Sequence, residues 1–167
     1  MKIRGYQYKE VFASLLKYLG DVADRIHAKR PDIPRPTVVY LDSYADFAKL
    51  PEGDLIFLSD WTMDVDGHEY GDKHNMLLGF AVVNDINGGK LEELYMNQLM
   101  LEIANRDSKK HTRIGIYSET GNEVIGTLVY APSYFTNSPR VDDSRTFRSV
   151  TVTMLSPQRL QIETSTV

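Results

Sequence analysis

The chain has 167 residues, of which 42% are hydrophobic and 25% are charged, the composition of one globular domain with a packed core. Its 19 basic and 23 acidic side chains give a net charge of −4, which does not support a nucleic-acid-binding surface. The lack of cysteine excludes disulfides, thiolate metal ligands and cysteine nucleophiles. No apolar run approaches the roughly eighteen residues of a membrane span, and MKIRGYQYKEVF has no signal-peptide core. We therefore expect a single soluble domain over residues 1–167, cytosolic where it is made.

The first predicted element is an amphipathic helix over residues 6–29. Its apolar residues recur at helical spacing, and charged residues occupy the opposite face. Prolines beginning with Pro31 end the helix, and a short β-branched strand is predicted at Thr37–Leu41. The apolar positions of the helix are Val11, Phe12, Leu15, Leu16, Leu19, Val22, Ala23 and Ile26.

Two further strands are predicted around a polar loop. The first is Asp54–Trp61, the loop is Thr62–Asn75, and the second strand is Met76–Val83. The continuous apolar run of this second strand indicates burial on both faces of a sheet.

The polar loop and its flanks carry carboxylates and imidazoles, which are metal-ligand types. A calcium-binding loop is not matched, because its first ligand position would fall on Thr62 and its twelfth on Lys73. The favoured interpretation is a solvated loop without a metal, and a metal-dependent enzyme using residues 60–74 is a remote alternative. The residues concerned are Asp60, Asp64, Asp66, His68, Glu69, Asp72 and His74.

A central helix is predicted over residues 89–105, after the turn Asn87-Gly88-Gly89-Lys90. This turn is not a phosphate-binding loop, because the glycines are adjacent and Leu91 follows the lysine. Apolar residues lie on nearly every side of the helix, so it needs a second cover besides its own sheet. The alternatives are burial within a monomer and contact with another subunit, and the latter is favoured. The candidate interface residues are Leu94, Met100 and Leu101.

Two strands, Thr112–Ser118 and Glu123–Tyr130, are predicted to form a hairpin through Thr120-Gly121-Asn122. A long polar segment over residues 132–146 follows, and long loops are usually functional or disordered. We expect either a disordered insertion or an arm that orders against a neighbouring subunit in a head-to-tail ring. Its candidate interface residues are Tyr134, Phe135, Arg140, Asp142, Asp143 and Arg145.

The last predicted strand is Phe147–Leu155, with Val150, Val152 and Met154 facing the core. Residues 156–167 form a polar C-terminal tail. Together these elements predict an α+β fold, with a mixed or antiparallel sheet of about five to six strands flanked by the N-terminal amphipathic helix and the central helix. The sequence lacks a Gly-x-Ser-x-Gly elbow, and its histidines lie in or beside polar segments, so we expect no enzyme, no catalytic residues and no cofactor.

The order of these elements resembles that of the tail terminator proteins of long-tailed bacteriophages. The resemblance lies in the amphipathic first helix, a strand ending in VVYL after prolines, a strand pair, a central helix and a closing hairpin ending in FRSVTVTML. It covers the chain from Tyr6 to Leu155 and concerns element order and size. Tail terminators are small α+β structural virion proteins that form a hexameric ring at the head-proximal end of the tail tube.

The resemblance implies a homo-oligomer that caps the tail tube, stops its polymerisation and forms the head–tail joining surface. Its partners would be the tail tube protein, the sheath where one exists, and a head-proximal neck protein. DNA would pass through the ring without specific binding, and the ring would be assembled in the host cytoplasm and reside in the virion. The extra length at Thr62–Asn75 and Pro132–Thr146 leaves open another neck or head-completion protein. An oligomeric accessory subunit outside phages is a further alternative.

Overall fold

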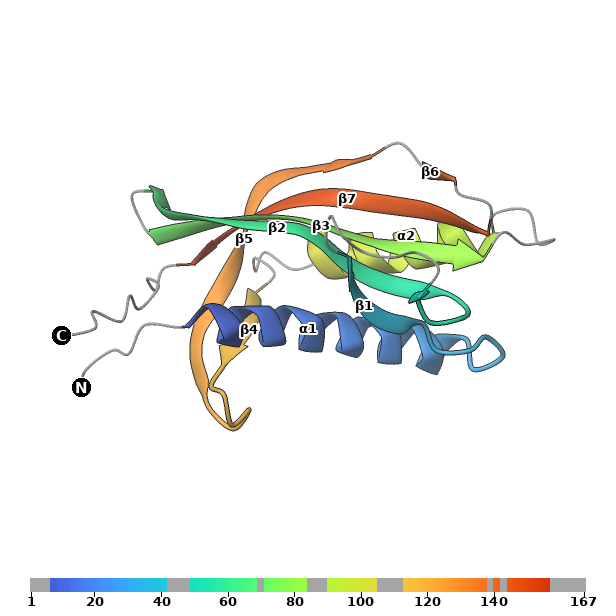
Figure 1. The fold of residues 1–167 in the computed structure, drawn as a ribbon, viewed down its shortest axis with the longest axis horizontal. Helices are drawn as coiled ribbons and strands as arrows, with labels where there is room; N and C mark the ends of the chain where they lie inside the picture. The colour runs from blue at the N-terminus through green and yellow to red at the C-terminus, as the bar shows by residue number, and fades with distance from the viewer. Residues whose placement is uncertain are drawn as a thin grey trace.

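The computed structural model describes residues 7–41, 49–68, 71–83, 90–104, 113–137, 140–141 and 144–156. These residues form two helices and one seven-stranded sheet (Figure 1). The elements in chain order are α1 (Tyr8–Lys29), β1 (Thr37–Leu41), β2 (Leu55–His68), β3 (Gly71–Val83), α2 (Lys90–Ala104), β4 (Arg113–Tyr117), β5 (Val124–Thr136), β6 (Arg140–Val141) and β7 (Arg145–Ser156).

The strand order is β1-β2-β3-β7-β5-β4, with the short β6 paired to β7. Strand β1 is parallel to β2, and all other pairs are antiparallel. The predicted α+β class with a mixed sheet is therefore confirmed. The predicted bounds of the helices and of β1 and β4 lie within two residues of those observed, as expected for ends that fray.

Helix α1 begins with a capping box at Gln7, whose backbone N–H donates to the Glu10 carboxylate at 3.0 Å. Its buried stripe is the apolar stripe that the periodicity predicted, with Val11, Leu15, Leu19, Val22 and Ile26 all buried. These side chains share one core with the inward residues of the sheet and with Tyr95 and Leu99 of α2. Both helices thus cover the same face of the sheet.

A smaller apolar cluster lies on the other face of the sheet and contains Leu55, Phe57 and Ala81. Burial on both faces of β3, expected from its continuous apolar run, is confirmed by Phe80 and Ala81, which are both fully buried. Gly79 is the cross-strand partner of Phe57, and a Cβ at Gly79 would lie only 2.8 Å from Cζ of Phe57. The missing side chain is what lets the Phe57 ring lie across β3.

The predicted polar loop at Thr62–Asn75 is wrong, because most of it is β structure. Strand β2 continues to His68 and β3 begins at Gly71. The outer part of the hairpin gains a second partner, since Asp72 to Asn75 also pair with the end of β7. Its polar composition hid the strands, because the signal for a half-buried strand is alternation of apolar and polar residues rather than overall hydrophobicity.

A β-bulge at Asp60 explains why the alternation of inward and outward side chains along β2 is interrupted at this residue. Ser59 pairs with Leu77 and Thr62 pairs with Asn75, so β2 carries one extra residue at this point. Asp60 adopts the left-handed conformation, with φ 49°. The extra residue shifts the phase of the strand, so Trp61 rather than Asp60 faces the core.

The predicted loop or arm over residues 132–146 is also mostly strand. Strand β5 runs on to Thr136, β6 pairs with β7, and β7 already begins at Arg145. Between Tyr130 and Tyr134 the register of β5 shifts against β7 by two extra residues. Pro132 lies in this bulge, where the missing N–H of proline costs no ladder hydrogen bond.

The final strand agrees with its prediction on the core face, since Val150, Val152 and Met154 are fully buried. Ser156 belongs to β7 and is buried, so it is not part of the tail that was predicted at 156–167. Residues 157–167 lie outside the described residues.

Candidate functional site

The residues of α2 that were predicted to form a subunit interface do not share one environment. Leu94 packs, half-buried, against the main core, whereas Leu101 is 59% exposed. Glu93 and Asn97 are exposed on the same side of the helix as Leu101. The side chain of Met100 lies outside the described set. Leu101 is therefore the one predicted α2 position that the described structure leaves exposed.

The orientation of α2 is fixed by polar anchors at Tyr95 and Gln98. The Tyr95 hydroxyl donates to Oδ2 of Asp54 at 2.8 Å, and its ring stacks on Phe80 with centroids 5.0 Å apart. Burial, reinforced by the bond to Asp54, raises the pKa of the Tyr95 hydroxyl above its ordinary value. Nζ of Lys29 donates to Oε1 of Gln98 at 2.7 Å, which ties the end of α1 to α2.

The second group of predicted interface residues falls on β5, β6 and β7. Tyr134 and Phe135 pair through their backbones with Val152 and Thr151 of β7. Arg140 belongs to β6, and Asp142 and Asp143 lie outside the described residues. The side chains of Tyr134, Phe135 and Arg140 are likewise not described.

Arg145 has an intrachain role instead of the predicted one. It is buried at the start of β7, and its guanidinium donates to the backbone carbonyl oxygens of Pro51 and Gly53, the latter at 3.1 Å. This side chain secures the segment that leads into β2. Nearby Val141 of β6 is 71% exposed, an apolar position that the sequence had not singled out.

The acidic residues proposed as remote metal ligands separate onto different sides of the hairpin. Asp60 and Asp64 are exposed, whereas Asp72 and His74 are buried. The side chains of Asp66, His68 and Glu69 are not described. Within the described part of the chain, no group of three carboxylate or imidazole side chains is placed to hold a metal ion.

His74 forms a buried pair with Trp61 across the hairpin. Nε1–H of Trp61 donates to Nδ1 of His74 at 3.2 Å, and the two rings lie nearly parallel. Because tryptophan can only donate, Nδ1 must be unprotonated and the imidazole neutral. Burial lowers the pKa of His74 from 6.5 to about 4, although the Asp72 carboxylate acts in the opposite direction.

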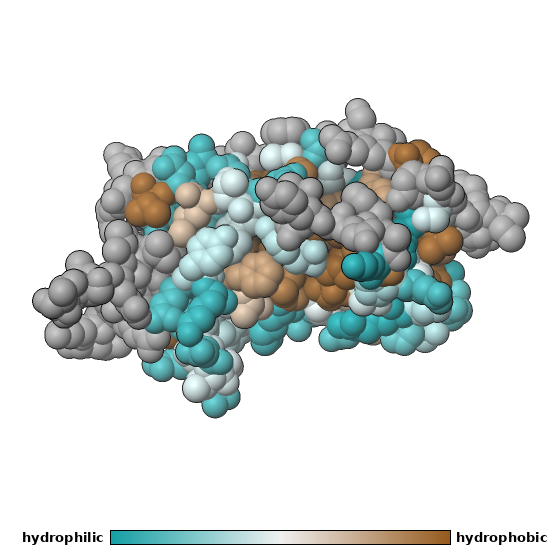
Figure 2. All heavy atoms as spheres, in the orientation of Figure 1, coloured by the Kyte–Doolittle hydropathy of each residue, from teal (hydrophilic) through white to brown (hydrophobic). Residues whose placement is uncertain are grey.

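A row of aromatic side chains, formed by Tyr8, Phe12, Tyr40 and Trp61, crosses from α1 to β1 and β2. Tyr8 stacks on Trp61 with centroids 4.4 Å apart, and Phe12 lies 6.0 Å from Trp61. The edge of Tyr40 meets Phe12 at 5.0 Å. Tyr8 is 54% exposed, and hydrophobic side chains gather in the middle of the face shown in Figure 2, above a hydrophilic lower rim. We call this surface the aromatic row.

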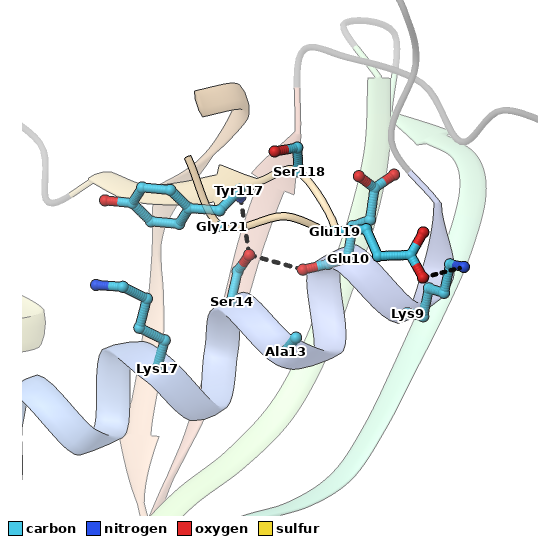
Figure 3. A pocket seen from close by; sticks show the side chains of 9 residues that line it. All are labelled: Lys9, Glu10, Ala13, Ser14, Lys17, Tyr117, Ser118, Glu119 and Gly121. Carbon is cyan, nitrogen blue, oxygen red and sulfur yellow. Dashed lines mark hydrogen bonds and ion pairs between the residues drawn. The ribbon is translucent and has the colours of Figure 1, made fainter. Parts of the chain in front are cut away.

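A second surface is a groove of about 310 Å³ between the first half of α1 and the turn from β4 to β5 (Figure 3). Ser14 links the two sides of the groove, because the Ser14 hydroxyl donates to the Glu10 carbonyl oxygen at 2.6 Å and accepts from the Tyr117 N–H at 2.9 Å. The lining residues are Lys9, Glu10, Ala13, Ser14, Lys17, Tyr117, Ser118, Glu119 and Gly121. We call this surface the α1–β4 groove.

Two lysines stand at the ends of the α1–β4 groove. Nζ of Lys9 lies 2.9 Å from Oε1 of Glu119, and Nζ of Lys17 lies 4.9 Å from the centre of the Tyr117 ring. Ala13 lies between them on the same helical face, with Lys9 four residues before it and Lys17 four residues after it. Sequence reasoning missed this groove, because nothing in the local pattern indicated that the distant Tyr117 would pack beside α1.

The chemistry of both surfaces suits binding. In the α1–β4 groove, the hydroxyl of Ser14 is occupied by two backbone partners, and none of the lining residues is a histidine that would activate it. The aromatic row offers large ring surfaces with polar edges, a composition enriched at protein interfaces.

No protein-family model and no curated protein sequence matches this chain. In the described part of the structure, neither helix combines the length and apolar character that crossing a membrane requires.

Proposed function

We propose that this protein is a structural subunit that assembles with copies of itself into a ring and acts as a tail terminator of a long-tailed bacteriophage. In this role the ring caps the tail tube, stops its polymerisation and offers a joining surface to the head. The order of helices and strands, which resembles that of tail terminators, supports the phage assignment. The aromatic row supports the assembly role.

The aromatic row is the observation that carries the proposal. Tyr8 and Tyr40 are both partly exposed; Tyr8 stacks on the buried Trp61, and Tyr40 makes an edge-to-face contact with the half-buried Phe12. Aromatic anchors of this kind contribute much of the binding energy of protein interfaces, because they bury a large area at a small entropic cost. A subunit that docks on this row would bury the exposed parts of Tyr8 and Tyr40.

The proposed mechanism is a difference between the two faces of the ring. One face imitates a layer of the tube and therefore binds its last layer, whereas the other face lacks the contacts that recruit a further layer. Where a sheath exists, the same ring can hold its final layer. The net charge of −4 suits a conduit for DNA, because a channel that passes DNA should not bind its phosphates.

A tube-assembly experiment tests the proposal. Tail tube protein of a virus that encodes this chain is polymerised with increasing amounts of the purified chain, and tube lengths are measured by electron microscopy. We expect shorter tubes with a ring at one end. Substitution of Tyr8 and Tyr40 by serine should abolish this effect, whereas Val65→Ser, at an exposed site outside the aromatic row, should retain it.

The contrary result is a wild-type chain that leaves tube lengths unchanged and never appears at tube ends. Circular dichroism and thermal melts of each variant separate loss of assembly from loss of folding.

A further inference from the structure

We infer that the turn joining α1 to β1 in one copy of this chain docks on the aromatic row of the next copy, with its Pro31 and Pro34 rings against the Tyr8 and Tyr40 rings. We call this turn, residues 30–36, the proline turn. The inference rests on the ring proposed above and names the anchor of its subunit contact.

The proline turn is exposed and yet held in one shape. The N–H of Ile33 donates to the carbonyl oxygen of Arg30 at 3.1 Å, and Nδ1 of His27 donates to the carbonyl oxygen of Ile33 at 2.9 Å. The Ile33 side chain is buried in the main core. Nε of Arg35 donates to Oδ1 of Asp24 on α1 at 2.6 Å. A segment fixed in this way loses little conformational entropy when it binds.

Two proline rings form the outer surface of the proline turn. Pro31 and Pro34 are exposed, whereas Ile33 and Pro36 are buried. A proline ring has almost no rotamer entropy to lose on burial, and proteins that bind proline-rich segments do so with aromatic side chains. The proline turn therefore fits a partner that presents exposed aromatic rings.

The aromatic row presents such rings in a fixed orientation. Tyr8 is 54% exposed and stacks on the buried Trp61, and Tyr40 is 36% exposed and meets the half-buried Phe12 edge to face. Within the described part of the chain, Tyr8 and Tyr40 are the two exposed aromatic side chains. They are therefore the surface of this protein that the proline turn of another copy fits.

Most exposed charges beside the two surfaces are already paired within the same chain. The pairs are Arg30 with Asp32, Arg35 with Asp24 and Lys9 with Glu119, whereas Asp60, beside Trp61, is exposed and lies outside them. The contact therefore depends on the packing of rings rather than on attraction between charges. Salt, which screens exposed charges, should leave it intact.

The two surfaces lie too far apart to meet within one chain. Tyr8 is the first residue of α1, whereas the proline turn follows the last residue of this helix (Figure 1). The helix has 22 residues, which corresponds to a length of about 33 Å. A contact between these unlike surfaces is heterologous, and repeated head to tail it closes into a ring when the rotation per subunit fits.

Photo-crosslinking tests the contact directly. p-Benzoylphenylalanine in place of Tyr8 keeps an aromatic ring in the row and forms covalent bonds to neighbouring groups on illumination. Copies with and without a heavy-nitrogen label are mixed and illuminated, and the linked peptides are identified by mass spectrometry. We expect links from position 8 to residues 30–36 of another copy, and no such links from the same amino acid at the exposed Val65. Links from position 8 to other segments only would overturn the inference.

Matched substitutions test each surface separately. Pro31→Ser with Pro34→Ser, and separately Tyr8→Ser with Tyr40→Ser, should each weaken self-association by about tenfold or more in sedimentation equilibrium. Tyr8→Phe with Tyr40→Phe keeps both rings and should associate normally, as should Pro51→Ser, which alters an exposed proline outside the proline turn. Circular dichroism and thermal melts of each variant separate loss of association from loss of folding.

A mixture of the two serine variants tests whether the surfaces meet each other. The proline variant keeps an intact aromatic row and the tyrosine variant keeps an intact proline turn, so one functional contact remains between them. We expect dimers with one copy of each variant and nothing larger, at about 0.1 M and about 1 M salt alike. A mixture that stays monomeric, or a dimer that dissociates at the higher salt, would contradict the inference.

The outcomes separate this inference from the function on which it rests. Rings that form normally in the proline variant overturn the contact and leave the proposed function intact. A wild-type chain that forms no ring, either alone or on the tube, overturns the proposed function. Rings that are linked through position 8 and residues 30–36 but leave tube lengths unchanged support the contact and overturn the terminator role.

Discussion

The hydroxyl of Tyr95 donates to Oδ2 of Asp54 at 2.8 Å, while Oδ1 of the same carboxylate accepts from the backbone N–H of Val83 at 3.0 Å. Asp54, the residue before β2, thus joins the start of β2 to the end of β3 and to the buried face of α2. This junction sets the rotation of α2 on the sheet and, with it, the side on which Leu101 is exposed.

Tyr95→Phe should lower the free energy of unfolding by about 2 kcal/mol, since it removes a hydrogen bond to a carboxylate in a partly buried setting. Urea denaturation followed by circular dichroism measures this change. Tyr8→Phe is the matched control, because the ring stack on Trp61 is retained. Equal stability of Tyr95→Phe and the wild type would show that the Asp54 contact does not hold α2.

Gly79→Ala should destabilise the protein by about 3 kcal/mol, because overpacking forces neighbours out of their positions. The new Cβ would lie 2.8 Å from Cζ of Phe57 and 2.8 Å from Cα of Ser149, and would also overlap the Arg148 carbonyl oxygen. Gly20→Ala is the contrasting control in α1, where the nearest atom, an Arg35 nitrogen, is 3.6 Å away. There the substitution should stabilise the helix by about 1 kcal/mol. Similar thermal midpoints for both variants would contradict the close approach at Gly79.

The stability of the fold should fall as the pH is lowered from about 6.5 to about 4, because His74 binds a proton more readily when unfolded. Its pKa is lowered on folding, so the unfolded chain carries more protons in this window and acid favours unfolding. The contribution of this one group amounts to about 3 kcal/mol across the window.

Urea denaturation at pH 7, 5.5 and 4 measures the dependence on His74. His74→Gln keeps a side chain that can accept from Trp61 but does not titrate, so its stability should depend less on pH over the same range. Identical pH profiles for the two proteins would contradict the burial of a neutral imidazole.

The left-handed backbone conformation of Asp60 predicts which substitutions this position tolerates. Because its φ of 49° suits glycine and asparagine, Asp60→Gly should be neutral or slightly stabilising. Asp60→Val should cost about 2 kcal/mol, since β-branched residues are strained in this conformation. Thr62→Val, at an exposed site two residues later, controls for the added apolar surface. Equal melting temperatures for the valine and glycine variants at position 60 would exclude the bulge.

Elements with a regular apolar period were predictable from the sequence. The apolar stripe of α1 and the alternation of Val150, Val152 and Met154 predicted where each element lies in the sequence and which of its side chains face the core. The outer β2–β3 hairpin was not predictable, because the bulge at Asp60 breaks the alternation and the buried positions beyond it include Asp72 and His74. The extension of β5 was hidden by Pro132, which normally ends a strand and here lies in a bulge.

The candidate surfaces depended on contacts between distant segments, which local patterns do not contain. Helical angle placed Leu94 and Leu101 on one side of α2, but only Leu101 is exposed, because Leu94 packs against the main core. Arg145 was assigned to an interface from its neighbours in sequence, whereas its partners, Pro51 and Gly53, lie more than 90 residues earlier in the chain. The α1–β4 groove required Tyr117 to pack beside Ser14, a separation of 103 residues.

The mass of the assembled particle tests the central claim most directly. Native mass spectrometry and electron microscopy of the full chain, alone and bound to tube ends, should show one closed species, a ring of six copies. A chain that stays monomeric in both settings, or that forms an open series of sizes without closure, would contradict the proposed role as a ring-forming tail terminator.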